Sequence, residues 1–570
     1  MTRKERLHFL LVSAFLVVLP LLLRSLWEPD EARYAEIPRE MLVLGDWLTP
    51  HLNFVPYFEK PPLQYWLSAC FMRLFGTHYF VVKLPLVLAG FISLWCGWRL
   101  AKLLGAGRPM HAVFMTATAL LPYICGQILT LDSLFSAFQV MAVLAVLEAV
   151  VATFYGYYSK GWTLLAFISL ALATLTKGLA APLLVGLTAA CSLPWTFVIP
   201  KLRSALLRVL FDPVGWLLFV VLVVPWFVIV DSVNPGHAKF FFVHEHFARF
   251  TSHVHCRQGS NNQIVDKLYF FVVLFLGLVP WLSSVFVGIK RCLTVIKCPA
   301  EFLGEQDLLH RWSFALVMLT SVWPLIFYTF SGSKLPPYIL PAVVPVLAIA
   351  CALERTSDEA WVTIHVGFEL ILLVLLFLPF YWLLADSSIR LGWVMLNGVI
   401  LVSIGFWAMR LPRICRGKLT VGLGFALLVT LIAATKVVSF SKDISTLLKA
   451  APINAQWISC GRYFQSIPFT TGNRVVVVGK AGELSFGSDC LNKQERDLWF
   501  YEDETMFTSV ALRMQKENQQ RPVWALVAIS AWKNLSNEQK RVWDVRGRSS
   551  SCLMVSLKQS ESRYSWSCFS

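Results

Sequence analysis

The chain has 570 residues, of which 57% are hydrophobic and only 15% are charged, and its mean hydropathy is +0.62. An average soluble domain carries about 25% charged residues, so this composition excludes a soluble globular protein and predicts a polytopic membrane protein. The formal net charge of +16 does not indicate a nucleic-acid-binding protein. Its basic residues occur in short clusters between apolar runs, as they do in the cytoplasmic loops of membrane proteins.

About thirteen apolar runs, of roughly 16–24 residues each, are long enough to cross a ~30 Å hydrocarbon core as helices. They lie at 7–26, 79–98, 110–128, 133–155, 161–176, 179–199, 213–231, 267–289, 312–330, 336–353, 361–384, 391–409 and 418–436. The first run follows Arg3, Lys4 and Arg6 and precedes no small-residue cleavage site, so we interpret it as an uncleaved span with a cytoplasmic N-terminus. Alternation from that end places the basic clusters in cytoplasmic loops and every candidate chemical motif on the opposite face.

The loop after the first span begins with Trp27-Glu28-Pro29-Asp30-Glu31-Ala32-Arg33. Charges at a membrane edge are costly and often mark a functional site, and helical spacing places Asp30 and Arg33 on one face. In one interpretation Asp30 or Glu31 is a catalytic carboxylate and Arg33 is a ligand for phosphate or carboxylate. In the other, this is a capped interfacial helix with several ion pairs.

Further along the same loop, Glu59 and Lys60 follow Tyr57 and precede two prolines. Proline fixes its own backbone and restricts the residue before it. The pattern therefore predicts an acid and a base on a stiff turn beside a tyrosine, although it also fits an ordinary proline turn.

Polar residues near the ends of three later spans also lie on the same predicted face of the membrane. Asp132 begins a span and is either a functional acid or a helix N-cap. Lys177 precedes Gly178 and is either a functional base or a snorkelling lysine at a helix stop. Lys334 and Tyr338 lie in a short loop that also fits a proline-broken helix start.

The loop 232–266 contains His244-Glu245-His246 and then Arg249. Histidine and carboxylate are ligands for zinc-like ions, but a His-x-His pattern without a fixed distant partner also fits a surface histidine cluster. Together, the bases in these loops would surround the phosphate of a lipid-borne anionic substrate, while tyrosines would contact a sugar or prenyl chain. The bases are Arg33, Lys60, Lys177, Arg249 and Lys334.

From about residue 437 the composition becomes polar and mixed. Three short segments are typical of strands in a small α/β domain of roughly 130 residues: Val475–Val478, Trp524–Ile529 and Leu553–Leu557. We therefore predict a membrane domain at 1–436, with outer loops at 27–78 and 232–266, and a C-terminal domain at 437–570. The chain has no CxxC pair, and four cysteines of the C-terminal domain would be able to pair outside the cytoplasm: Cys460, Cys490, Cys552 and Cys568.

The loop motifs resemble those of a known family. WEPDEARYAEIPREM, GDWLTPHL and YFEKPP, which begin at Trp27, Gly45 and Tyr57, closely resemble the first periplasmic loop of bacterial lipid-to-lipid glycosyltransferases of the GT-C superfamily. The resemblance is greatest to the aminoarabinose:lipid A transferases (ArnT type). LD, TKG, EHFARF and SKLPPY follow in the expected order, and the resemblance covers roughly residues 1–350.

The resemblance implies a GT-C fold of about 13 transmembrane helices with a small C-terminal α/β periplasmic domain, in a monomer of the bacterial inner membrane. It implies undecaprenyl phosphate carrying 4-amino-4-deoxy-L-arabinose as the donor, a lipid A phosphate as the acceptor, and inversion at the sugar C1 on the periplasmic side. It also implies roles for individual residues. Asp30 matches the principal catalytic aspartate, Asp132 a second acidic position, Glu59 and His246 a metal pair (usually zinc), Arg33, Lys60 and Lys177 positions around the donor phosphate, and Tyr57 and Tyr338 the cavity lining.

Two alternatives for the function and one question about the metal ligand stay open. A GT-C transferase with another sugar or acceptor, such as a protein O-mannosyltransferase, would share these motifs. His244 also precedes Glu245 where the family pattern has no histidine, which leaves open which imidazole binds metal. A lipid flippase or transporter would instead place charges or broken helices near mid-membrane, whereas these charges gather at the outer ends of spans.

Overall fold

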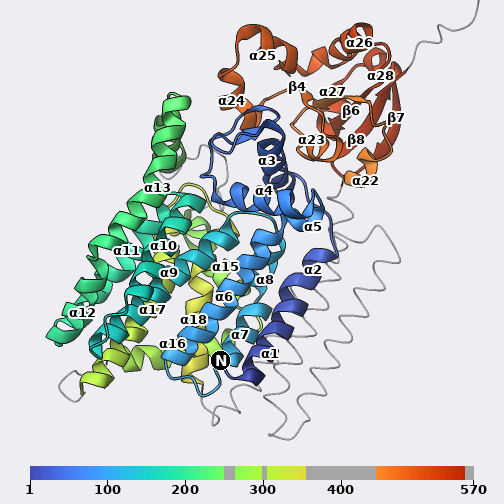
Figure 1. Ribbon diagram of the computed structural model, residues 1–570. Helices are drawn as coiled ribbons and strands as arrows, with labels where there is room; N and C mark the ends of the chain where they lie inside the picture. Colours follow the sequence, from blue (N-terminus) through green and yellow to red (C-terminus); the bar gives the residue numbers. More distant parts are fainter. Residues whose placement is uncertain (249–262, 298–303, 355–443, 559–570) are drawn as a thin grey trace, which may run out of the picture. The chain divides into compact units, whose positions relative to one another are not determined.

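The computed structural model describes residues 1–248, 263–297, 304–354 and 444–558 (Figure 1). The chain divides into two compact units. The helical unit comprises Met1–Leu23, Glu59–Leu67 and Lys83–Thr435, as far as these are described, and the second unit comprises Arg24–Phe58, Ser68–Val82 and Lys436–Ser570, with the same limit. Most of the first loop therefore belongs to the same unit as the C-terminal segment.

Helices occupy each predicted span up to residue 353. They are α1 (Arg3–Ser13), η1 (Ala14–Val18), α2 (Leu19–Leu22), α6 (Leu84–Leu103), α7 (Met110–Thr118), α8 (Leu120–Gln127), α9 (Asp132–Phe154), α10 (Lys160–Lys177), α11 (Ala180–Ser192), η2 (Leu193–Thr196), α13 (Pro213–Val233), α15 (Gln263–Gly277), α16 (Leu282–Lys297), α17 (Glu305–Thr329), η5 (Pro336–Ile339) and α18 (Leu340–Leu353). Helices α4 (Leu63–Phe75), α12 (Pro200–Leu210) and η3 (Lys239–Ala248) lie between the predicted spans. The spans predicted at 361–384, 391–409 and 418–436 lie outside the described residues.

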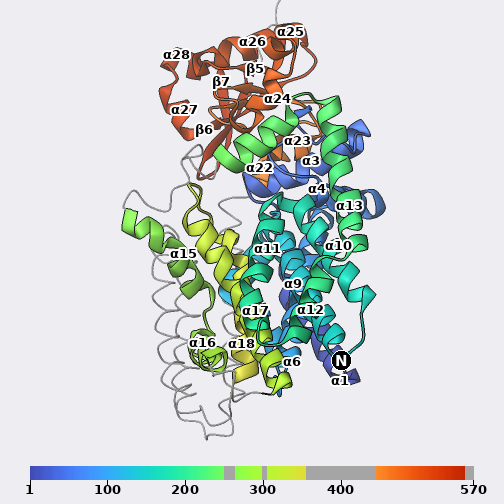
Figure 2. The ribbon, with the colours of Figure 1, turned by 90° about the vertical axis from the view of Figure 1, so that its left-hand side faces the viewer.

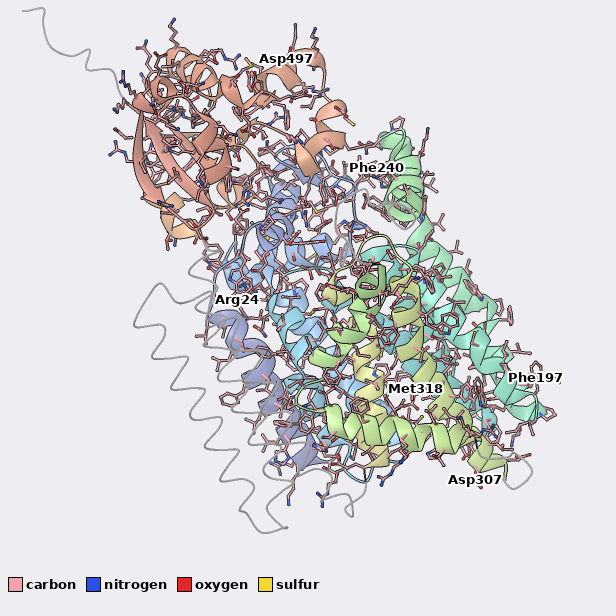
Figure 3. All side chains as sticks on the ribbon, turned by 180° about the vertical axis from the view of Figure 1, so that it is seen from behind. Arg24, Phe197, Phe240, Asp307, Met318 and Asp497 are labelled. Carbon is pink, nitrogen blue, oxygen red and sulfur yellow. The ribbon has the colours of Figure 1, made fainter. Side chains whose placement is uncertain are left out.

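Within the described part of the chain, six helices are long and apolar enough to cross a membrane, or seven if the bent pair α15 and α16 counts as one span. Helix α9 is buried along most of its length because it is apolar on all sides and packs against α6, α10 and α12. Helix α13 instead exposes Leu217, Val221 and Val228, and Phe197 before α12 is also exposed (Figure 3). Apolar surface of this extent suits lipid rather than water.

Two predicted spans are broken, so the expectation of one continuous helix over each is wrong. The span at 110–128 is interrupted at Ala119, which has extended backbone angles between α7 and α8. The span at 267–289 consists of α15 and α16, and the chain bends by 113° between them. Pro280 lies in this break, where its missing N–H and the restriction on the residue before it prevent the helix from continuing.

The two breaks are joined by one backbone and one side-chain hydrogen bond. The Leu120 N–H donates to the Val279 carbonyl at 3.0 Å, and Trp281 Nε1 donates to the Thr118 hydroxyl at 3.0 Å. An unpaired peptide group inside a membrane is costly, so irregular backbone at that depth needs partners from protein. The Leu120–Val279 bond supplies one such partner within the helical unit.

The C-terminal part of the second unit is built on a six-stranded mixed sheet in the order β5-β4-β3-β6-β8-β7. Its strands are β3 (Gln456–Cys460), β4 (Val475–Val478), β5 (Phe500–Tyr501), β6 (Val523–Ala528), β7 (Trp543–Arg548) and β8 (Cys552–Leu557), with the β3–β4, β3–β6 and β4–β5 pairs parallel and the others antiparallel. Every residue of β4 and β6 is buried, as expected for strands covered on both faces. Helix α26 (Phe507–Glu517) packs against β3 and β6, and α27 (Ile529–Asn534) against β6 and β8 (Figure 2).

The predicted α/β character of this region is confirmed, and the three predicted strands are β4, β6 and β8. Strands β3, β5 and β7 were not predicted: β5 has only two residues, and β3 and β7 each contain several polar residues. The remaining helices are α22 (Ser445–Leu448), α23 (Ser466–Thr471), η8 (Gly482–Leu484), α24 (Ser485–Asp489), α25 (Lys493–Trp499), η9 (Glu504–Met506) and α28 (Asn537–Arg541). Cys460, Cys490 and Cys552 are free thiols, and Cys568 lies outside the described residues.

The first loop contributes helix α3 (Asp30–Leu44) and a hairpin of β1 (His51–Leu52) and β2 (Val55–Pro56) to the second unit, which also contains α5 (Tyr79–Val82) at the start of the next predicted span. Helix α3 ends at Gly45, whose φ of 69° is the left-handed conformation common at helix ends. The hairpin tip is bound to β4, because the Asn53 side chain donates to the Val475 carbonyl and accepts from its N–H, both at 2.9 Å.

Candidate functional site

Helix α3 begins with two acids that have different surroundings. Both suit the positive end of the helix dipole. The Glu31 carboxylate is buried, binds the Arg24 guanidinium through two contacts of 2.5 and 2.6 Å, and accepts the Trp27 N–H at 2.8 Å. The Asp30 side chain is 50% exposed. The geometry therefore favours Asp30 as the reacting carboxylate and gives Glu31 the task of holding the chain before α3.

Arg33 lies one helical turn after Asp30 and its side chain is only 6% exposed. Its guanidinium contacts Asp30 Oδ1 at 2.6 Å and forms an ion pair with Glu483. Burial alone would lower the pKa of Arg33, but the neighbouring Tyr57, Glu483, Tyr34 and Asp30 raise it well above its usual value. Arg33 therefore remains a cation, held within the second unit by two carboxylates.

Other carboxylates near α3 are buried and hold the local structure together. Glu36 pairs with Arg39 at 2.5 Å, and Glu40 accepts the Phe54 N–H at 2.8 Å. Burial raises the pKa of both carboxyls. Glu28 accepts the Ser466 N–H, and burial raises its pKa to about 7. These groups connect α3 to its own unit.

In the helical unit, the Lys177 side chain at the end of α10 is only 12% exposed and lies beside Asp132 at the start of α9. Lys177 Nζ lies 2.5 Å from Asp132 Oδ1 and 4.1 Å from the centre of the Tyr338 ring, with the Phe135 and Tyr328 rings also adjacent. The N-cap of α9 is Leu131 and Asp132 is already its first helical residue, so the capping interpretation is wrong. The helix does stop at Lys177, but the side chain is enclosed by an acid and aromatic faces rather than snorkelling to solvent.

Lys60 also has a carboxylate partner. Its ammonium group donates to the Glu59 carbonyl at 2.7 Å and lies 3.0 Å from Glu245 Oε2. His244 Nδ1 is 3.4 Å from the other oxygen of Glu245. Glu245, which the sequence placed only inside the EHFARF motif, is thus the partner of Lys60.

Lys334 is almost fully buried in the loop before η5. Its ammonium group donates to the carbonyls of Thr329 at 2.7 Å and Ser331 at 2.9 Å, and lies 3.3 Å from Asp266 Oδ2. Asp266 carries no motif signal, so sequence analysis missed it. The four predicted cations with described side chains therefore all sit beside carboxylates. This arrangement lowers the cost of burying a cation and fixes its position.

The metal prediction rests on Glu59 and His246, and the His246 side chain and Arg249 lie outside what the structure describes. Among the described residues, no group of three or more His, Cys, Asp or Glu side chains is arranged to hold a metal ion. A zinc site uses three or four protein ligands, so the described donors do not by themselves make one. His237, from the same loop, is buried against Trp226 and Phe241, and burial lowers its pKa to about 4.

The two predicted tyrosines are both buried, one in each unit. Tyr57 follows the β2 strand, and its N–H donates to the Pro50 carbonyl at 2.8 Å. Tyr338 covers Lys177 and contacts Tyr328, with the ring centres 5.0 Å apart. Tyr328 and Glu483 were missed because no local motif marks a residue that reaches a cation from another segment.

Comparisons with known proteins first identify the structural class of this chain. A family model for dolichyl-phosphate-mannose-protein mannosyltransferases matches residues 59–229. The crystal structure of ArnT from Cupriavidus metallidurans bound to undecaprenyl phosphate superposes with a TM-score of 0.72, covering 98% of this chain and 99% of that one at 22% identity. The apo structure of the same protein gives a TM-score of 0.71. This is a multi-pass membrane protein with the GT-C glycosyltransferase fold.

Curated relatives narrow the class. An undecaprenyl phosphate-alpha-4-amino-4-deoxy-L-arabinose arabinosyl transferase of Enterobacter sp. is 31% identical over 422 residues, which are 71% of this chain and 70% of that protein. The chain belongs to this family of arabinosyl transferases. A relative from Pseudomonas fluorescens is 32% identical over 353 residues, and one from Edwardsiella ictaluri is 30% identical over 346. The matches span 59% and 58% of the length of these two relatives.

Proposed function

We propose that this protein transfers 4-amino-4-deoxy-L-arabinose from undecaprenyl phosphate to a phosphate of lipid A. The observation that carries this proposal is the 31% sequence identity with the Enterobacter arabinosyl transferase, which extends over 70% of that protein. The structural match to ArnT supports the fold in which such a reaction would take place. The exposed Asp30 and the carboxylate-held cations supply chemistry that suits it.

The reaction breaks the bond between the sugar C1 and the oxygen of the donor phosphate, and the electron pair stays on that phosphate. An oxygen of the acceptor phosphate forms the new bond to C1 from the opposite face, which inverts the centre. Fixed cations stabilise the charge that develops on the leaving phosphate. We assign this task to Arg33, Lys60 and Lys177, with Lys334 and Arg249 as further cationic positions. Lys60→Ala should weaken use of the donor.

Asp30 has a different task for each kind of acceptor. A hydroxyl acceptor would need a general base. A phosphate acceptor is already anionic, so Asp30 instead orients the reacting groups and balances the charge of Arg33, which it contacts at 2.6 Å.

We further propose that the protein works as a monomer in the bacterial inner membrane, with α3 and the C-terminal domain on the periplasmic side. The supporting argument is the distribution of basic clusters, which alternation assigns to the cytoplasmic side. An alkaline phosphatase fused after residue 558 should be active, because that enzyme needs the periplasm. An inactive but well-expressed fusion would reverse the proposed orientation.

The test is mass spectrometry of lipid A from a Gram-negative host that lacks its own transferase. The wild-type chain should add a mass equal to aminoarabinose, and Asp30→Asn should abolish the addition at equal membrane expression. Asp497→Asn is the matched control, because Asp497 is an exposed acid on α25 of the same unit (Figure 3). Lipid A without the addition, despite good expression of the wild type, would contradict the proposal.

A second candidate is a GT-C transferase that uses another sugar or acceptor. The mannosyltransferase family model over residues 59–229 favours it. The structure gives little support to the transporter alternative, because the helix breaks at Ala119 and at residues 278–281 contain no charged residue that would bind a substrate there. A wild-type chain that adds hexose to protein or to another lipid, with unmodified lipid A, would select the second candidate.

A divalent metal, zinc above all, is a separate proposal for Glu59 and His246. It rests on the family resemblance and on the chemistry of the two donors, and further ligands would have to come from outside the described residues. When bound, such an ion would neutralise phosphate charge. Elemental analysis of the purified protein tests it: Glu59→Ala should reduce bound metal, with Glu305→Ala on α17 as the control. Unchanged metal content would remove Glu59 from this role.

A further inference from the structure

A short segment of the C-terminal domain, η8 with α24 (residues 482–489), packs directly on the first loop within the second unit. A Cβ atom at Gly487 would lie only 2.3 Å from the Pro56 carbonyl oxygen, so the two backbones are in close contact. The Phe486 and Phe58 rings meet edge to face, with their centres 5.5 Å apart. These contacts fix residues 482–489 against the loop that leads to Glu59.

The same segment reaches Arg33. Glu483 forms an ion pair with the Arg33 guanidinium, while Asp30 holds it at 2.6 Å from within α3. Glu483 is itself held, because the Gln465 side-chain amide donates to its other oxygen at 2.8 Å. The guanidinium is therefore bound by one carboxylate from its own helix and by one from a segment 450 residues away in sequence.

This arrangement differs from an ordinary surface ion pair. Arg33 is buried to 6% exposure, whereas Glu483 is 29% exposed. A guanidinium is planar and its donors point in fixed directions, so two carboxylates on its two terminal nitrogens restrict both its position and its orientation. Without Glu483, Asp30 would hold one terminal nitrogen and the Tyr34 ring would lie 5.3 Å from the guanidinium carbon, but the other terminal nitrogen would lose its carboxylate.

We infer that Glu483 is a positioning residue that holds Arg33 in the orientation needed to bind the donor phosphate. The C-terminal domain thereby takes part in catalysis, because it supplies the contact that sets a cation of the first loop. The inference rests on the proposed function of Arg33. It assigns to Glu483 no contact with the substrate.

The test is a double-mutant cycle in the full-length protein, with Arg33→Ala, Glu483→Gln and the two combined. Small displacements of a positioning group cost up to about 100-fold in rate, and we expect Glu483→Gln to lower kcat/KM for the donor by roughly 10- to 100-fold. The loss should appear mainly in KM for the donor and not in KM for the acceptor. Glu483→Asp should recover part of it, and Glu483→Gln should cause no further loss in the Arg33→Ala protein.

Glu495→Gln is the matched control, because Glu495 forms a 3.0 Å ion pair with Arg474 in the same domain. It should leave kcat/KM unchanged. Binding of undecaprenyl phosphate to each purified protein gives a second readout that does not depend on the sugar or the acceptor. An unaffected Glu483→Gln variant, or losses that multiply in the double variant, would overturn the positioning role.

The outcomes also separate this inference from the proposed function. A wild-type chain that binds undecaprenyl phosphate but leaves lipid A unmodified would overturn the proposed acceptor or sugar. In that case, binding of undecaprenyl phosphate by the Arg33 and Glu483 variants would still test the positioning role of Glu483. An Arg33→Ala variant with full donor binding and turnover would overturn both the phosphate role of Arg33 and the positioning role of Glu483.

Discussion

Removing the charge of Asp132 should strongly destabilise the helical unit. Asp132→Asn keeps the size of the side chain but leaves the buried Lys177 ammonium without its carboxylate. At the observed separation of 2.5 Å and an effective dielectric of about 20, the Coulomb energy of the pair is about 7 kcal/mol. Desolvation offsets part of this, and breaking one partner of a buried pair typically costs about 3–5 kcal/mol. The Tyr338 face recovers no more than about 2 kcal/mol by its cation–π contact.

The assay is equilibrium unfolding of the purified protein in detergent, for Asp132→Asn, Lys177→Met and the double variant. The double variant removes both charges, so it should be more stable than the sum of the two single losses predicts, by about 3 kcal/mol. Lys160→Met is the control, because Lys160 pairs with Asp212 at 2.9 Å but its side chain is 43% exposed, against 12% for Lys177. Additive losses in the double variant, or a cost below about 1 kcal/mol for Asp132→Asn, would refute the reasoning.

Three further predictions concern stability. Burial raises the pKa of Glu28 from 4.5 to about 7. The contribution of Glu28 to the free energy of unfolding is therefore fully present below pH 4.5 and falls by about 3 kcal/mol as the pH rises through 7. Glu28→Gln should stabilise the second unit at pH 8 but hardly at pH 4, which thermal unfolding at both pH values can show. In Gly288→Ala the new Cβ would lie 2.6 Å from the Ala350 Cα, so we expect a loss of about 1–3 kcal/mol in denaturant unfolding, and an unchanged midpoint would contradict the close packing of α16 on α18. Asn53→Ala removes both hydrogen bonds to Val475 and should cost about 1–3 kcal/mol and speed amide exchange in the β1–β2 hairpin; unaltered exchange would show that the hairpin is held by other contacts.

The sequence by itself determined the class of the protein and the identity of most candidate groups. Apolar runs of membrane-spanning length are a local property, and each of those up to residue 353 proved helical. The strands β4 and β6 were predicted for the same reason, since buried strands are continuous apolar segments. Asp30, Lys177 and Lys334 were identified because charged residues beside apolar runs are conspicuous.

Only the tertiary structure decided which groups meet. Lys177 is paired with Asp132, Lys334 with Asp266, and Arg33 with Glu483, and these partners come from separate segments. The breaks in the helices over 110–128 and 267–289 likewise match one another through the Leu120–Val279 hydrogen bond.

The physical reason is that local propensity and periodicity are set by neighbours along the chain, whereas an ion pair between distant segments depends on the packing of the whole unit. Glu483 shows this most clearly. It lies in a short polar turn with no motif of its own, and its relation to Arg33 exists only because η8 and α24 pack on the first loop.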